Sequence, residues 1–474
     1  MNKLIPLSSI ATLKTGPFGT QFSANEYVES GIPVINVRNI GYGEIITDDL
    51  EYVNEETRER LSEHILKTGD IVFGRKGSVD RHAYIDDRYD GWVQGSDCIR
   101  VRCSSEVNTR YLSHFLKLEF VKNQINNAAV GSTMASLNTD ILGRVRIALP
   151  CREIQDRIER VLSAIEEKIE NNSLISIQLE SMAKALYDYW FVQFDFPDAN
   201  GKPYRASGGE MVWNEQLKRE IPKKWDVGMV DNLGSIVSGG TPTTTNEDYY
   251  TDNGIAWITP NDLSGNEQRM FVGHGERDIS VEGLRNSSAT LMPENSVLFS
   301  SRAPIGYIAI STNEICTNQG FKSIVPDKGY GAYYIYYTIK RNTPAIAKQG
   351  VGTTFKEVSG DTLKKFRICL PTKDIAEFFE KQVQAICERR RLLEQENTEL
   401  SELRDWLLPM LMNGQATVAP AESAPKLQVL QPEKPARDPR FDRWLQTQGV
   451  AARGTVDEQI LHDIFDAMDD DDKQ

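Results

Sequence analysis

The sequence predicts an α/β tandem repeat, in which two mixed α/β domains are joined by two long helices that form an antiparallel coiled coil. Residues 131–150 read GSTMASLNTDILGRVRIALP and residues 352–371 read GTTFKEVSGDTLKKFRICLP, with eight of twenty aligned positions identical. Average composition alone gives roughly one identity in such a pair. Each copy is followed by a run of about 40 residues whose apolar side chains recur at heptad spacing.

The repeat extends well beyond this phrase. Residues 31–35 match 254–258 at an offset of 223, residues 66–85 match 291–310 at 225, and residues 153–170 match 374–391 at 221. The offset drifts as it does when loops vary in length and secondary-structure elements persist. The 474-residue chain is therefore read as two similar halves, a length that suits two or three domains.

Each half reads as mixed α/β. Short β-branched runs such as IPVINV, DIVFG and CIRVRC lie between turn residues and predict strands. Residues 110–125 and 332–347 predict helices. Pro150 and Pro371 then close a strand and open a long helix, where proline near the first turn is tolerated.

The two long helices have the clearest pattern. The heptad positions of the first are Ile154, Ile158, Val161, Ile165, Lys168, Asn172, Ile175, Leu179, Met182, Leu186 and Tyr189. Those of the second are Ile375, Phe379, Gln382, Ile386, Arg389, Leu393, Glu396, Leu400, Leu403, Leu407 and Met410. These apolar seams predict a coiled-coil and subunit interface with polar interruptions near its middle.

A rod of roughly 60 Å at 1.5 Å per residue must bury its stripe, and the nearest partner for each helix is the other. Because a whole domain separates them in the chain, an antiparallel pair is the natural closure. The alternative is that each helix packs only on its own domain.

The predicted limits are 1–150 for the first domain, 151–192 for the first helix, 193–220 for a turn-rich linker, 221–372 for the second domain and 373–412 for the second helix. Residues 413–474 are rich in Ala, Pro and acidic groups and predict a flexible acidic tail, with one short amphipathic helix near its end.

Composition bounds the class of protein. Hydrophobic residues make up 40% and the net charge is −14; basic groups nevertheless cluster locally, as at 74–77 and 389–391, so that the composition neither requires nor excludes DNA. There is no signal peptide and no membrane-length apolar run. Six cysteines without a CxxC pair favour a reducing cytoplasm over disulfides or zinc.

Catalytic and metal motifs are missing from the sequence. GDIVFGRKGS (69–78) has Arg where a phosphate-binding loop needs Lys, no HExxH or GxGxxG motif occurs, and the five histidines are scattered. We therefore expect no catalytic residue and no metal site in this chain. A duplicated non-catalytic unit on a rod suits a ligand with two sites at fixed spacing, of which DNA is the obvious one.

The ordered phrases resemble the specificity (S) subunits of type I restriction–modification systems. The resemblance rests on 221–242, 254–263, 297–310, 317–324 and the phrase GTTFKEV…RICLP that leads into the second helix, with weaker versions at 131–150 and 185–204. It covers about residues 4 to 412. The first half lacks the PKKW phrase of 222–225, and the tail beyond 413 has no counterpart.

The resemblance implies a bacterial or archaeal cytoplasmic subunit without catalytic activity. Each domain would be a target-recognition domain for one half of a split double-stranded DNA site, and the helices would set the gap and recruit two methyltransferase (M) subunits. Restriction/translocase (R) subunits would join that core. S-adenosylmethionine, ATP and Mg²⁺ would then be bound by partner subunits and no cofactor by this chain.

Polar and basic loop residues matched between the halves are the candidates for DNA contact, because Arg suits guanine edges, Asn suits adenine, and Ser, Thr or Lys suit phosphates. They are Arg38, Asn39, Arg75, Lys76, Ser132 and Thr133 in the first half, and Asn261, Asp262, Ser301, Arg302, Thr353 and Thr354 in the second. Each could instead serve as a turn or cap residue.

Two other classes stay open at this stage. A standalone nucleic-acid enzyme with disguised motifs would show activity with DNA, Mg²⁺, ATP and S-adenosylmethionine in the absence of partners. A protein-binding scaffold would lack the steep salt dependence and split-site specificity of a DNA reader.

Overall fold

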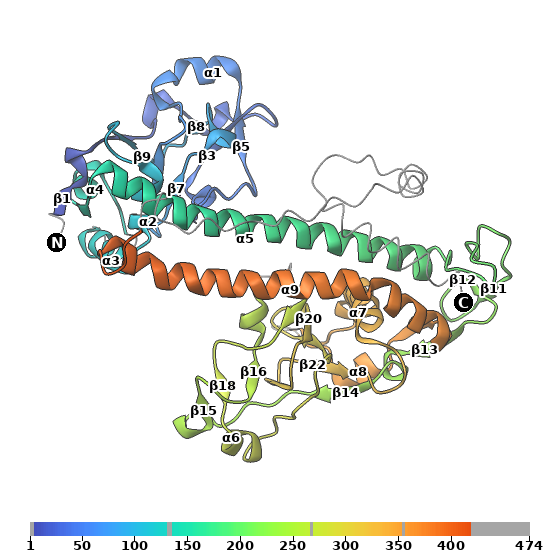
Figure 1. Cartoon of the computed structure of the whole chain (residues 1–474). Helices are drawn as coiled ribbons and strands as arrows, with labels where there is room; N and C mark the ends of the chain where they lie inside the picture. Colours follow the sequence, from blue (N-terminus) through green and yellow to red (C-terminus); the bar gives the residue numbers. More distant parts are fainter. Residues whose placement is uncertain (1–3, 130–134, 266–268, 353–355, 419–474) are drawn as a thin grey trace, which may run out of the picture. The chain divides into compact units, whose positions relative to one another are not determined.

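The computed structural model describes residues 4–129, 135–265, 269–352 and 356–418 (Figure 1). Serines, threonines and prolines 132, 133, 353, 354 and the tail beyond 418 lie outside this part of the chain, so the DNA-contact predictions for Ser132, Thr133, Thr353 and Thr354 fall on residues that the structure does not describe. The chain forms two compact units, 1–169 with 398–432 and 170–397 with 433–474.

The first unit is built on a five-stranded sheet of order β2-β9-β6-β7-β4, in which only the pair β4 and β7 is parallel. Its strands are β2 (Ala11–Thr15), β9 (Cys98–Cys103), β6 (Ile71–Gly74), β7 (His82–Tyr84) and β4 (Tyr42–Gly43). A second sheet holds β5 (Glu51–Val53), β3 (Ile32–Ile35) and β8 (Val93–Gln94), and β1 (Leu4–Pro6) pairs with β10 (Arg146–Ala148). The helices are α1 (Glu55–Arg60), α2 (Thr109–Leu116), α3 (Glu119–Ala128) and α4 (Thr139–Gly143).

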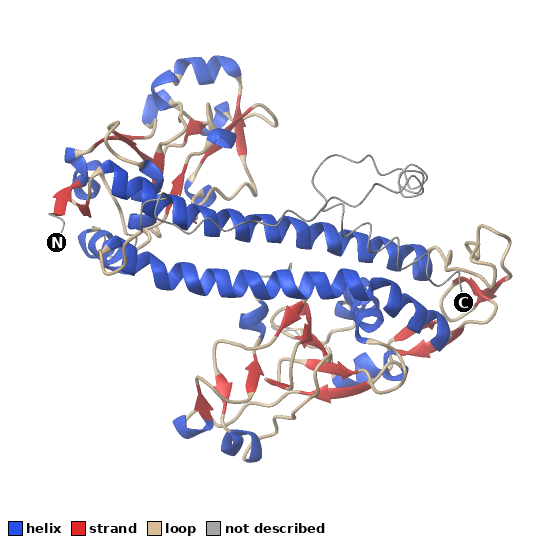
Figure 2. Cartoon of the chain, in the orientation of Figure 1, coloured by secondary structure: helices blue, strands red, loops and turns tan. Residues whose placement is uncertain are grey.

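The second unit repeats this topology with the order β14-β22-β19-β20-β17, and its edge pair β17 and β20 is again parallel. The strands are β14 (Ser235–Ser238), β22 (Lys322–Val325), β19 (Val297–Ser301), β20 (Ile305–Ser311) and β17 (Phe271–Val272). Shorter pairs are β13 (Asp226–Met229) with β23 (Arg367–Leu370), β16 (Ala256–Ile258) with β21 (Ile315–Thr317), and β15 (Tyr250–Thr251) with β18 (Asp278–Ile279). The helices are α6 (Val281–Arg285), α7 (Ala332–Ala347) and α8 (Gly360–Lys364) (Figure 2).

The predicted elements are found with two differences. The helix expected at 332–347 is α7, whereas that expected at 110–125 is two helices, α2 and α3, because the chain is extended at Leu118 (ψ 135°). The stretch predicted as a linker contains a hairpin of β11 (Met211–Asn214) and β12 (Arg219–Pro222), and its Phe194 and Phe196 are buried in the second unit's core. The predicted domain limits as such remain a proposal.

The two longest helices are α5 (Arg152–Tyr187) and α9 (Lys373–Met412), drawn in green and orange in Figure 1. In the second unit Asn172 donates to Glu396 at 2.8 Å and Arg390 to Ser176 at 3.2 Å. Positions rise along α5 as they fall along α9, so the helices pair antiparallel. A five-residue π-helix, Asp188–Val192, follows α5.

Each helix also packs on a domain, so both arrangements weighed from the sequence occur together. Ile158 and Leu162 belong to the same core cluster as Leu411 and Met412 and the first sheet. Phe379 and Val383 belong to the core of the second unit. Along the predicted seams Ile158, Leu179, Phe379, Ile386 and Leu393 are buried, Val161, Ile165, Met182, Leu186, Ile375, Leu400 and Leu407 are half-buried, and Ile154 and Leu403 are exposed.

Candidate nucleic-acid interface

In each domain, loops that are far apart in sequence meet at one end of the five-stranded sheet. In the first unit the meeting point is the turn 95–97, which leads into β9. Gly95 N–H donates to Ile35 O, just before the loop that carries Arg38, and Arg75 N–H donates to Asp97 O at 2.8 Å. Leu137 N–H donates to Arg75 O at 2.9 Å. We call residues 16–21, 36–39, 75–77, 95–97 and 135–137 the first loop edge.

The second unit builds the same arrangement around the turn 318–320, which leads into β22. Asn318 N–H donates to Ile258 O, Ser301 N–H to Gly320 O, and Val358 N–H to Ser301 O, at 2.9, 2.7 and 3.0 Å. We call residues 239–243, 259–262, 301–304, 318–320 and 356–358 the second loop edge. The two edges are therefore duplicated in their backbone hydrogen bonds as well as in sequence.

A glycine at the start of each edge makes the close approach possible. A Cβ atom at Gly16 would lie 1.9 Å from Gly95 O, and a Cβ atom at Gly239 would lie 1.9 Å from Asn318 O. No side chain fits at such a distance, so the loop after β2 or β14 can touch the central turn only through glycine.

Two of the predicted DNA-contact residues are buried and hold the backbone instead. Asn39 is 0% exposed, and its amide donates to Ile46 O and Asp48 O while its Oδ1 accepts from Asn36 N–H. Ser301 is 0% exposed and donates to Gly320 O at 3.0 Å. This corrects the expectation for both residues, since a buried side chain whose hydrogen bonds are made inside the domain has no free face for DNA.

Asp262 also acts as a cap. Its carboxylate accepts from Thr259 N–H and from Glu276 N–H, each at 2.7 Å. The neighbouring Asn261 is exposed. Of this matched pair, Asn261 is thus the side chain whose amide lies at the surface.

The basic side chains of the edges lie beside carboxylates of the same domain. Lys76 Nζ is 3.1 Å from Asp97 Oδ2, and Arg302 is 3.8 Å from Glu357. Arg38 lies between Asp49 and Glu51, at 3.4 and 3.2 Å. These pairs are largely exposed and weak in water, so that a DNA phosphate or base can compete with the carboxylate for the cation.

Arg75 differs from these residues because its Nε atom is buried and has no hydrogen-bond partner within the described part of the chain. A buried guanidinium donor without a partner is unfavourable unless a ligand supplies an acceptor. Arg75 is therefore the first-edge residue whose geometry most favours an external acceptor.

Several edge residues were not predicted from the sequence. Phe18 is 63% exposed next to Gly16. Gln319 is exposed in the central turn and bonds to Thr241. Lys322 lies 3.9 Å from Glu357, and burial lowers its pKa although Glu357 opposes that shift. The only sequence signal for these positions was that TNQGFKSI repeats QGSDCIRV at an offset of 223.

Neither a metal site nor a membrane helix is found in the part of the chain that the structure describes. No group of three or more His, Cys, Asp or Glu side chains there is placed to hold a metal ion. Among the same residues, no helix combines the length and the apolar character that a membrane crossing requires.

Comparison with known proteins agrees with the duplicated architecture. The family model described as "Type I restriction modification DNA specificity domain" matches residues 3–181 and again 222–396. The HindI type I specificity subunit of Haemophilus influenzae is 24% identical over 80% of this chain and 94% of its own length. The MjaIX specificity subunit of Methanocaldococcus jannaschii is 32% identical over 41% of this chain and 48% of its own.

The fold is also found in a solved structure. The S subunit of a type I restriction–modification system from M. genitalium matches with a TM-score of 0.54 and 13% identity. The match covers 86% of this chain and 96% of that one. At this identity the likeness concerns the fold.

Proposed function

Because the chain belongs to the family of type I restriction–modification DNA specificity subunits, we propose that its two loop edges are the surfaces that read the two halves of a split DNA site. The subunit has two target-recognition domains and is the non-catalytic partner of a methyltransferase and endonuclease. One observation carries the proposal: the same four backbone contacts assemble the same loops around turns 95–97 and 318–320.

The residues proposed for direct contact are the exposed polar and basic ones. They are Arg38, Arg75 and Lys76 on the first edge, and Asn261, Arg302 and Gln319 on the second. Arginine and glutamine or asparagine can bond two atoms of a guanine or adenine edge, whereas lysine suits phosphate. The undescribed Ser132, Thr133, Thr353 and Thr354 follow or precede edge segments in the chain and remain candidates.

The partner subunits are proposed as two methyltransferase (M) and the restriction/translocase (R) subunits, with double-stranded DNA, in the cytoplasm of the cell. S-adenosylmethionine, ATP and Mg²⁺ would be bound by those partners. Exposed apolar side chains on the long helices support helix docking: Leu174, Ile177 and Leu392 in the second unit, and Leu403 and Trp406 in the first, are each between 41% and 59% exposed. Such side chains favour a protein interface.

The test is a genome-wide map of adenine methylation in cells that carry this gene and a matching methyltransferase subunit, against cells that lack only this gene. The expected result is a split motif, two short halves with a fixed gap, that disappears on deletion. Unchanged methylation while the subunits still assemble would contradict the proposal and favour a protein-binding scaffold. Methylation or cleavage by the purified chain alone would favour a standalone enzyme.

A further inference from the structure

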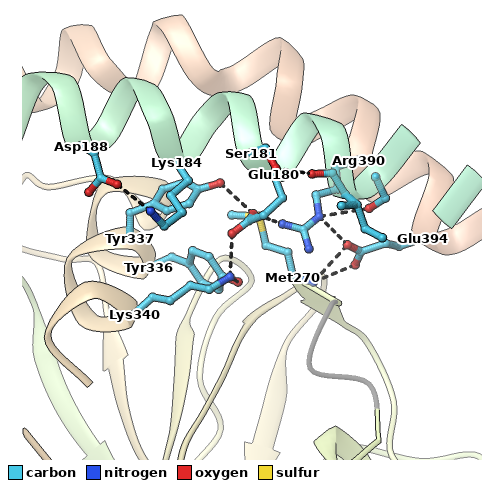
Figure 3. Close-up of polar contacts among 12 residues, drawn as sticks. Glu180, Ser181, Lys184, Asp188, Met270, Tyr336, Tyr337, Lys340, Arg390 and Glu394 are labelled. Atoms are coloured by element: carbon cyan, nitrogen blue, oxygen red, sulfur yellow. Dashed lines mark hydrogen bonds and ion pairs between the residues drawn. The ribbon is translucent and has the colours of Figure 1, made fainter. Parts of the chain in front are cut away.

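The recognition domains are held on the long helices by polar contacts that the DNA-reading role does not by itself require. In the second unit Lys340 on α7 extends to Glu180 on α5, with Nζ and Oε1 2.6 Å apart. The other oxygen of Glu180 accepts from Tyr337 OH at 3.0 Å. Figure 3 shows this carboxylate between the recognition domain and the two helices.

The same carboxylate belongs to a larger buried network. Glu180 also pairs with Arg390 of α9, and Arg390 pairs with Glu394 at 2.8 Å. Glu394 in turn accepts from the backbone N–H groups of Met270 and Phe271, at 3.0 and 2.9 Å, where the edge strand β17 begins (Figure 3). The domain is thus tied to both helices, at α7 and at β17.

The first unit has a lysine tether at the equivalent position. Residues 111–117, YLSHFLK, match residues 334–340, YIYYTIK, at an offset of 223, so that Lys117 corresponds to Lys340. Lys117 Nζ lies 2.8 Å from Glu166 Oε1 on α5. His114 Nδ1 lies 3.7 Å from the same carboxylate, in the place that Tyr337 takes in the second unit.

The acidic partners, by contrast, are not equivalent in the repeat. At the offset of 221 that relates the two helices, Glu166 corresponds to Cys387 and Glu180 to Ser401. The lysine recurs while each half supplies its carboxylate from a different helix position. A general packing need would be met by any apolar residue, and replacing buried ion pairs by apolar groups often leaves stability unchanged. A directional contact is better explained by a need for one docking geometry.

We propose that the Lys117–Glu166 and Lys340–Glu180 pairs are positioning contacts that fix each recognition domain on α5 and thereby restrict the gap between the two half-sites that the subunit accepts. Each added base pair moves a half-site by about 3.4 Å along the duplex and about 35° around it. A domain held at one angle on its helix tolerates such a step poorly, and a loosened domain tolerates it better. This inference rests on the proposed function.

The test uses the full chain assembled with its methyltransferase subunits and S-adenosylmethionine. The substrates are duplexes that carry the mapped half-sites with the native gap or with one base pair more or fewer. Lys340→Met and Lys117→Met should each lower the preference for the native gap by about fivefold, the scale of a partly buried ion pair, while both half-site sequences stay the same. Lys340→Arg, which keeps the charge, should restore the preference.

Lys184→Met is the matched control, because Lys184 pairs with Asp188 on the same helix and does not contact the recognition domain through that pair. Gap preference equal to wild type in both methionine variants would overturn the inference, and so would an equal loss of methylation at all gaps, since a positioning contact redistributes activity among gaps. If Lys340→Met fails to fold, Lys117→Met in the other unit decides alone. A wild-type complex without any split motif would instead contradict the proposed function.

Discussion

The side chain of Glu380 on α9 caps the helix α7: its Oε1 accepts from Tyr334 N–H at 3.0 Å. The N-cap residue of α7 is Gly331, which has no side chain to do so. In the first domain the equivalent helix α2 is capped by its own residue, Asn108, whose Oδ1 accepts from Tyr111 N–H at 3.0 Å. One half of the repeat therefore uses a local cap, and the other borrows its cap from the long helix.

The first prediction concerns the pH dependence of stability. Burial raises the pKa of Glu380 to about 7, although the N–H groups of Tyr334 and Tyr333 oppose this shift. The folded state then binds the proton more tightly than the unfolded state, so this group's contribution to stability is present below about pH 4.5 and is lost as the pH rises to about 7. The loss amounts to at most about 3 kcal/mol.

Glu380→Gln should abolish this part of the profile. The amide oxygen can still accept from Tyr334 N–H, so the variant should differ from wild type by a constant amount above pH 7 and lose its relative stability between pH 7 and 4.5. Urea unfolding followed by circular dichroism at several pH values measures the difference. The buried His82 and His114, whose pKa values burial lowers to about 3 and about 4, contribute equally to both proteins and cancel. Parallel profiles would contradict the prediction.

The second prediction concerns the glycine approach at the second loop edge. Gly239→Ala should lower the free energy of unfolding by about 2 kcal/mol, because its Cβ would lie 1.9 Å from a backbone oxygen that cannot move without opening the edge. Recognition of one half-site should weaken as well. Gly360→Ala is the control, since its Cβ would meet only ordinary contacts, at 3.8 Å from Lys322 Cδ. Equal stability of the two variants would count against this reading.

The third prediction concerns the pair of Asp70 and Arg102 in the first sheet. Two guanidinium nitrogens of Arg102 lie 2.7 and 2.6 Å from the Asp70 carboxylate, which is 1% exposed. Arg102→Met removes the partner of a buried charge and should cost about 2 kcal/mol. The exposed pair of Lys218 and Glu215 provides the comparison, because Lys218→Met should change stability by less than about 0.5 kcal/mol. Thermal unfolding of both variants tests the contrast.

The fourth prediction separates the two half-sites. Arg302→Ala should weaken or shift recognition in one half of the methylation motif and leave the other half unchanged. Lys76→Ala should weaken binding through the opposite half, with a shallower dependence of affinity on salt if it contacts a phosphate. Methylation mapping and binding at several salt concentrations give both readings. The same half affected by both variants, or neither, would refute the assignment.

The sequence already contained most of the architecture. Heptad spacing predicted α5 and α9, because burial of one helix face requires apolar residues every three or four positions whatever the partner is. Internal repetition predicted two domains of one topology. The matched phrases also marked Arg75 and Lys76 in the first half and Arg302 in the second as exposed loop residues.

The loop edges were only partly visible in the sequence. Their central turns, 95–97 and 318–320, meet the other loops through backbone N–H and C=O groups, which every residue except proline presents alike. Such contacts leave no pattern of residue types. For the same reason Asn39 and Ser301 were misread: a polar residue in a loop can face solvent or cap the backbone, and its own identity does not distinguish the two.

What the sequence by itself determined about this protein is the number of its domains, their topological likeness and the two helices that follow them, because periodicity and repetition are properties of the chain order. Only the tertiary structure decided which carboxylate each lysine meets. Lys117 and Lys340 occupy the same place in the repeat, yet one reaches Glu166 and the other Glu180. The physical reason is that side-chain pairing depends on how far a helix has turned at the point of contact, and that is set by the packing of the whole domain against it.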